Sequence, residues 1–126
     1  MKILVYGAAG RLGRMVAKIL RAQGYSLRLG GSELERLQAV SQLGDEITSA
    51  PLEQQLRGIS VVANCAPLDA TASGALIRAA LAADAHYADI TGDQDVIRQI
   101  FDTHNQAAKA AGLCVVPALG LDYAVG

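Results

Sequence analysis

Three regularly spaced glycines constrain this chain more than any other feature of its sequence. Gly7, Gly10 and Gly13 follow a short apolar run (residues 2–6) and open a segment with helical apolar spacing (residues 11–23). Glycine permits a tight turn, a close backbone approach to a ligand and close packing of the helix on the strand. The N–H groups at the start of the helix lie at the positive end of its dipole and suit a pyrophosphate. The pattern therefore predicts a dinucleotide site, with a ligand-free glycine turn as the alternative.

The rest of the chain alternates short apolar strands with amphipathic helices. Strands are predicted at residues 2–6, 25–29, 46–48, 59–66, 86–91 and 113–119. Helices are predicted at residues 11–23, 32–43, 51–57 and 68–83, and between Asp93 and Gly112. In the second helix, Ser32 and Glu35 match a capping box, so Ser32 is the expected N-cap. Six strands and five helices predict an α/β fold, a Rossmann-type doubly wound parallel sheet in the order 3-2-1-4-5-6.

Length and composition limit the class of protein. The 126 residues are enough for one domain, and an apolar share of 52% is enough for a packed core. A formal net charge of −1 argues against a nucleic-acid partner. No apolar run approaches the roughly 20 residues of a membrane helix, and the N-terminus lacks the apolar stretch of a signal peptide. Cys65 and Cys114 lie in apolar runs, so we expect buried thiols, no metal site and a cytoplasmic location.

The end of the second strand bears on the choice of cofactor. An Asp or Glu there binds the ribose hydroxyls of NAD, whereas Arg or Ser accommodates the 2′-phosphate of NADP. Residues 29–32 (LGGS) contain no acid, and Ser32, Arg11 and Arg36 are candidates to bind a phosphate. In the alternative interpretation, Ser32 is only a helix cap, and Arg11 and Arg36 are ordinary solvated side chains. The missing carboxylate favours NADP, and NAD is the alternative.

Four segments together resemble a known family. They are GAAGRLG (residues 7–13), VVANCAP (61–67), ALIRAALAADAHYADITGD (75–93) and AAKAAGLCVVPALGLD (107–122). With these residues, nearly the whole chain resembles the N-terminal NAD(P)-binding domain of the saccharopine dehydrogenase-like oxidoreductases. The positions that match the family's polar and glycine motifs are Asn64, Pro67, Tyr87, Asp89, Gly92, Asp93, Gly120 and Asp122.

The resemblance implies a function. The chain would hold a nicotinamide dinucleotide for hydride transfer at a C–N or C=C bond. A second domain would contact the substrate and would also form the interface of a homodimer. That domain is expected to be absent here, so that residues 1–126 form the dinucleotide-binding domain alone. Gly31 stands where many relatives carry an arginine that grips the 2′-phosphate. A stand-alone dinucleotide-sensing or interaction module is the alternative. A short-chain dehydrogenase is disfavoured, because no tyrosine is followed four residues later by lysine.

The predicted cofactor-binding residues come from four places in the chain. They are the glycine loop, the end of the second strand, the third strand and the end of the fourth: Gly7, Ala9, Gly10, Arg11, Leu12, Gly13, Ser32, Ile47, Thr48, Cys65, Ala66 and Pro67. Ile47 and Thr48 are candidates for an adenine wall, and a short edge strand explains them nearly as well. Asp89 is either part of an active-site floor or a structural carboxylate, and His104 is expected to pack against its neighbours. No residue is predicted to be catalytic.

Overall fold

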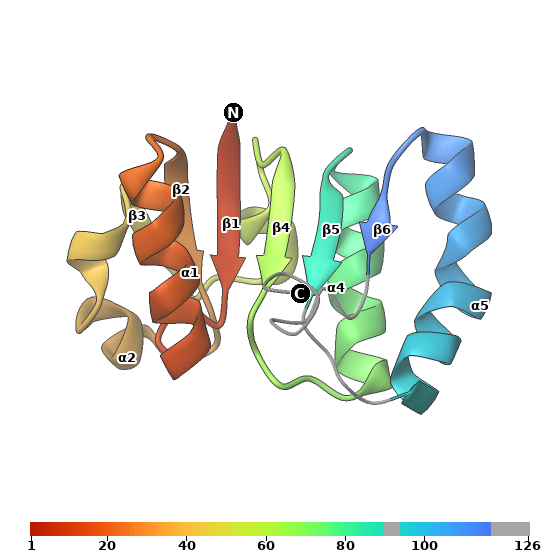
Figure 1. Ribbon diagram of the computed structural model, residues 1–126, viewed down its shortest axis with the longest axis horizontal. Coiled ribbons are helices and arrows are strands. Elements are labelled where there is room, and N and C mark those ends of the chain that lie inside the picture. Colours follow the sequence, from red (N-terminus) through yellow and green to blue (C-terminus); the bar gives the residue numbers. More distant parts are fainter. Residues whose placement is uncertain (90–93, 117–126) are drawn as a thin grey trace.

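Six parallel strands form one sheet in the computed structural model of the protein, which describes residues 1–89 and 94–116 (Figure 1). The strands are β1 (Lys2–Tyr6), β2 (Ser26–Gly30), β3 (Glu46–Thr48), β4 (Val61–Asn64), β5 (His86–Asp89) and β6 (Val115–Val116). The helices are α1 (Arg11–Ala22), α2 (Leu34–Gln38), α3 (Leu52–Gln55), α4 (Ala70–Ala82) and α5 (Gln94–Ala111), with a 3₁₀ turn at Ser41–Leu43. The predicted α/β class is confirmed.

The strand order places β1 at the centre of the sheet. The order is β3-β2-β1-β4-β5-β6, as predicted, and the end of β1 pairs Tyr6 with Gly30 of β2 and with Asn64 of β4. All strands point toward the lower edge of the sheet in Figure 1. The strands β2 and β3 extend the sheet on one side of β1, and β4, β5 and β6 extend it on the other. The connections that follow β1 and β4 therefore diverge, and a crevice opens between them at this edge.

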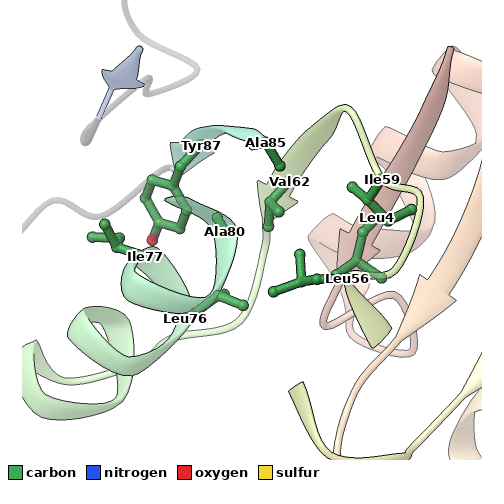
Figure 2. Close-up of a cluster of buried hydrophobic side chains, with 9 residues drawn as sticks. All are labelled: Leu4, Leu56, Ile59, Val62, Leu76, Ile77, Ala80, Ala85 and Tyr87. Carbon is green, nitrogen blue, oxygen red and sulfur yellow. The ribbon is translucent and has the colours of Figure 1, made fainter. Parts of the chain in front are cut away.

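Two apolar clusters cover the two faces of the sheet. Alternate side chains of a strand point to opposite faces, and β1 contributes to both clusters. Leu4 packs with Val62 and with side chains of α4 on one face (Figure 2). Ile3 and Val5 pack with Ala17 of α1 on the other. This double burial is why β1 is almost wholly apolar.

The second helix is shorter than predicted, and the predicted capping box is wrong. Instead of one helix over residues 32–43, α2 ends at Gln38 and a separate 3₁₀ turn follows. Glu33, not Ser32, is the N-cap residue, and no side chain caps the helix. Val40 has non-helical dihedral angles (φ −118°, ψ 14°) and is buried in the core beside α1, so tertiary packing interrupts the helix.

Cys114 is exposed, which corrects the prediction of a buried thiol, whereas Cys65 is buried as expected. Cys114 precedes the short strand β6, and its backbone N–H donates to Nδ1 of His86 (3.0 Å). The predicted strand ends at residues 90–91 and 117–119, and Asp93, lie outside the described residues. Within the described ranges, no helix has the length and apolarity to cross a membrane. Nor do three or more His, Cys, Asp or Glu side chains gather there to hold a metal ion.

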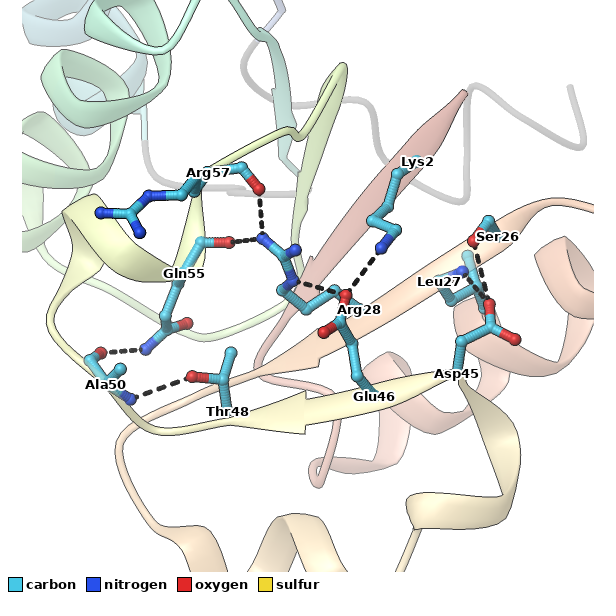
Figure 3. Close-up of polar contacts among 10 residues, drawn as sticks. All are labelled: Lys2, Ser26, Leu27, Arg28, Asp45, Glu46, Thr48, Ala50, Gln55 and Arg57. Carbon is cyan, nitrogen blue, oxygen red and sulfur yellow. Dashed lines mark hydrogen bonds and ion pairs between the residues drawn. The ribbon is translucent and has the colours of Figure 1, made fainter.

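Glu46 of β3 ties the three strands of one half of the sheet together (Figure 3). Its carboxylate accepts from Lys2 Nζ of β1 (2.8 Å) and from Arg28 Nε of β2 (2.9 Å). Arg28 Nη1 also donates to the carbonyl oxygens of Gln55 and Arg57, both at 2.7 Å. The hydrogen bond from Lys2, and then that from Arg28, lower the pKa of Glu46 below its ordinary value of 4.5.

Replacing Glu46 by Gln will test this contribution. Because the pKa of Glu46 is lowered in the folded state, its stabilisation is present above pH 4.5 and is lost as the pH falls below that value. We expect Glu46→Gln to lower the free energy of unfolding by less than about 1 kcal/mol at neutral pH, because the pair is partly solvated. Urea unfolding should show a smaller loss of stability on acidification for this variant than for the wild type. Glu53→Gln, at an exposed position on α3, is the control, and an unchanged acid dependence in Glu46→Gln would contradict the prediction.

Candidate functional site

A cavity of about 830 Å³ opens at the carboxyl edge of the sheet. Its volume lies within the range of small-molecule sites. Nine of the twelve residues predicted to bind a cofactor line it, namely Gly7, Ala9, Gly10, Arg11, Leu12, Ser32, Cys65, Ala66 and Pro67. The topology therefore brings together segments that lie more than 50 positions apart in the sequence.

The three glycines of the loop have different structural roles. Gly7 has a positive φ of 81°, and a Cβ there would lie 2.7 Å from the backbone nitrogen of Ala66. A Cβ on Gly13 would lie 2.1 Å from the carbonyl oxygen of Gly7. These two glycines allow close packing of the backbone. Gly10 has an ordinary φ of −74°, and its nearest neighbour, the Gly7 carbonyl oxygen, would be 3.4 Å from an added Cβ.

The start of α1 presents backbone donors at the cavity. Gly10 is the N-cap residue, and its carbonyl accepts the first bond of the helix from the N–H of Arg14 (3.0 Å). The N–H groups of Arg11, Leu12 and Gly13 therefore have no acceptor within the helix, and Arg11 and Leu12 line the cavity. Arg11 and Arg14 add positive charge to this first turn. Backbone donors, helix dipole and side chains all favour an anion here.

The end of β2 forms one flank of the cavity. Ser32 and Arg36 line it together with Arg11 from the glycine loop. A Cβ on Gly30 would lie 2.4 Å from Gln55 Oε1 and 2.8 Å from a methyl group of Leu4, so an acidic side chain does not fit at this position. Glu33 also lines the cavity, and sequence analysis overlooked it although it lies three residues beyond the strand.

A buried polar network forms the opposite flank, at the ends of β4 and β5. Asn64 Nδ2 donates to the Tyr87 hydroxyl oxygen (3.0 Å), and that hydroxyl donates to Asp89 Oδ2 (2.6 Å). Asn64 and Asp89 line the cavity, as does Ser73 of α4. Burial, and then the hydrogen bond with Asp89, raise the pKa of Tyr87, so its phenol stays protonated. Asp89 therefore lines the cavity and also accepts a hydrogen bond from Tyr87, as a structural carboxylate does.

Cys65 follows β4 and lines the same flank. Burial raises the pKa of its thiol to about 11. A thiol with this pKa is protonated at neutral pH and is a weak nucleophile. Cys65 is therefore a packing residue of the cavity wall.

The other predicted residues lie away from the lining of the cavity. Gly13 packs beneath the loop, and Ile47 packs against the cluster beside α1. Thr48 Oγ1 accepts from the N–H of Ala50 (3.2 Å). Their role as an adenine wall remains a prediction. His104 is buried near Gly74 of α4, where burial, and then Arg78, lower its pKa, and it packs as expected.

Comparison with curated proteins finds two relatives, both provisionally named trans-acting enoyl reductases from strains of Mycobacterium tuberculosis. Each is 30% identical over 136 aligned residues, which cover 95% of this chain and 32% of the relative. The chain therefore spans about a third of the length of the curated relatives it matches. No protein-family profile matches the chain.

Solved structures share the fold across almost the whole chain. Apo saccharopine dehydrogenase (L-Glu forming) from Saccharomyces cerevisiae matches with a TM-score of 0.77 and 20% identity, over 98% of this chain and 29% of that one. An imine reductase from Myxococcus stipitatus in complex with NAD⁺ matches with a TM-score of 0.70 and 16% identity, over 93% and 39%. The predicted resemblance to saccharopine dehydrogenase is thus confirmed at the level of the fold, which is a Rossmann fold.

Proposed function

We propose that this chain is the NAD(P)-binding domain of a saccharopine dehydrogenase-like oxidoreductase. The observation that carries the proposal is the start of α1, where Arg11 and Leu12, whose N–H groups have no acceptor within the helix, line a cavity of about 830 Å³ beside an unobstructed Gly10. A pyrophosphate fits this arrangement, because it needs several backbone donors and a close approach to the main chain. The fold shared with dinucleotide-dependent enzymes supports the same proposal.

The bound cofactor would supply the hydride, and this chain would supply its position. The N–H groups at the start of α1 would hold the two phosphates, and the flanks formed by β2 and β4 would hold the two halves of the dinucleotide. Asn64, Ser73 and Asp89 border the flank beside β4.

The partner domain and the reaction class are part of the proposal. Residues 1–126 act as the cofactor domain, and a second domain presents the substrate and forms a homodimer. The span of about a third of the curated relatives supports this division. The names of those relatives and of saccharopine dehydrogenase favour a C=C or a C–N bond as the site of hydride transfer. The free thiols of Cys65 and Cys114 support a cytoplasmic location.

We further propose that NADP is preferred over NAD. Ser32, Arg11 and Arg36 surround the flank at β2, where a 2′-phosphate would lie. A side chain at Gly30 would meet the buried side chains of Gln55 and Leu4, which disfavours at that position the carboxylate that would bind ribose hydroxyls. Glu33 adds a negative charge to this flank and repels a phosphate, so the preference for NADP requires that the attraction of Arg11 and Arg36 outweigh this repulsion.

The first prediction concerns Gly10. An Asp fits there and is a favourable N-cap, so Gly10→Asp should fold normally. Its carboxylate would occupy and repel the phosphate site, and we expect the Kd for NADPH to rise by at least about tenfold, or 1.4 kcal/mol. Fluorescence titration with NADPH and with NADH measures this effect. Gly10→Asn, a neutral N-cap of the same shape, is the matched control and should bind more tightly than Gly10→Asp. Equal binding by Gly10→Asp and the wild type would overturn the phosphate site.

The second prediction concerns cofactor choice. Loss of a charge-assisted bond to phosphate should make Arg36→Gln bind NADPH about tenfold more weakly while leaving NADH within about twofold. Glu33→Gln should have the opposite effect on NADPH. Arg21→Gln, at an exposed position in the last turn of α1 that does not line the cavity, is the control. Tighter binding of NADH than of NADPH by the wild type would contradict the preference.

The third prediction concerns the two cysteines. The exposed thiol of Cys114 should react readily with iodoacetamide at about pH 7, whereas Cys65, whose thiol has a pKa of about 11, should react slowly. Saturating NADPH should slow alkylation of Cys65 further and leave Cys114 unaffected. Mass spectrometry of the labelled peptides measures both rates in one sample. A rate at Cys65 that does not respond to NADPH would argue against a cofactor beside β4.

A further inference from the structure

Three buried side chains beside the cavity are joined by two hydrogen bonds that run in the same direction. This network links Asp89 through Tyr87 to Asn64, and these side chains are 3%, 1% and 3% exposed. Asp89 and Asn64 border the cavity, whereas Tyr87 lies in the apolar cluster between the sheet and α4 (Figure 2). The inference below rests on the proposed function, because it concerns how this network shapes the dinucleotide site.

The hydroxyl of Tyr87 determines the orientation of the Asn64 amide. A phenol has one hydrogen to donate, and Tyr87 donates it to the carboxylate of Asp89 at 2.6 Å. Toward Asn64 the phenol oxygen can therefore only accept, so the amide must present Nδ2 to it, at 3.0 Å. The other atom of the amide, Oδ1, is then directed to the backbone of the next turn.

That turn forms one wall of the cavity. Asn64 Oδ1 accepts from the N–H of Ala66 at 3.0 Å, which holds the turn at residues 65–67. Ala66 in turn lies against Gly7, where an added Cβ would approach its nitrogen to 2.7 Å and its Cβ to 2.9 Å. A reversed Asn64 amide would place an NH₂ group against the N–H of Ala66 and push the turn away from its position.

We propose that Tyr87 is a positioning residue for the dinucleotide: through Asn64 it holds the turn at residues 65–67 against the glycine loop and so shapes the half of the cavity beside β4. Tyr87 acts indirectly, because its hydroxyl is hydrogen-bonded to Asn64 and Asp89 and its ring is buried in the core. The half of the cavity beside β2 lies across β1 from this network.

The test compares two ligands that occupy different parts of the cavity. NADPH would span both flanks. The ligand 2′,5′-ADP lacks the nicotinamide half and would occupy only the flank at β2, where the 2′-phosphate would lie, and the adjoining start of α1. Tyr87→Phe removes one hydroxyl and with it the hydrogen bonds to Asn64 and Asp89. We expect it to raise the Kd for NADPH about tenfold and to change that for 2′,5′-ADP by less than about twofold. If the wild type prefers NADH, NADH and AMP replace these ligands.

A double-mutant cycle separates positioning from a general loss of structure. Asn64→Ala removes the acceptor for Ala66 and should show the same split between the two ligands. If Tyr87 acts through Asn64, adding Tyr87→Phe to Asn64→Ala should change the Kd for NADPH by less than about twofold. Tyr25→Phe, an exposed tyrosine outside the site, is the control and should bind both ligands like the wild type.

The outcomes distinguish this inference from the proposed function. A wild type that binds neither NADPH nor NADH overturns both. Unchanged binding of NADPH by Tyr87→Phe, equal weakening of both ligands, or additive effects in the double variant overturns the positioning role alone. If Tyr87→Phe does not fold, the split between the two ligands in Asn64→Ala decides the question, and its absence refutes the inference.

Discussion

The contact between Gly7 and Ala66 is the constraint on which the rest of the site depends. It joins the end of β1 to the turn after β4, the two neighbouring strands from which the chain diverges, and it leaves no room for a Cβ at Gly7. Gly13 packs as closely on the carbonyl oxygen of Gly7, so α1 begins directly at the edge of the sheet. Only because both side chains are absent can the N–H groups of α1 face the cavity instead of being displaced from it.

The two flanks of this contact use opposite kinds of polar chemistry. At β2 the residues are exposed and charged, with Arg36 and Glu33 on a short helix and little burial. At β4 and β5 they are buried and linked to one another, from Asn64 to Asp89. An exposed charged flank can exchange water for a phosphate at small cost, whereas a buried network must satisfy its own groups and so holds one geometry. This asymmetry matches a ligand with one phosphorylated end and one uncharged or weakly charged ring.

The fold alone carries little of this information. Solved structures at 15–22% identity share the fold over most of the chain, yet their names describe different reactions. Function resides in the side chains placed on such a scaffold. In this chain those side chains are the arginines beside β2 and the network beside β4, and both come from segments that follow the carboxyl ends of strands.

Local sequence patterns determined much of this protein. The apolar run of β1, the glycine spacing and the alternation of strands and helices act within a few residues, and right-handed crossovers then restrict the strand order. Together with the family resemblance, they predicted nine of the residues that line the cavity. Tertiary structure decided the rest. Asn64 meets Asp89 and Tyr87 only through the register of β4 on β5. Val40 leaves the predicted helix because it packs in the core, and Glu33, the N-cap residue of α2, lines the cavity. Such contacts join distant segments, and their geometry depends on the packing of the whole sheet, which no local pattern encodes.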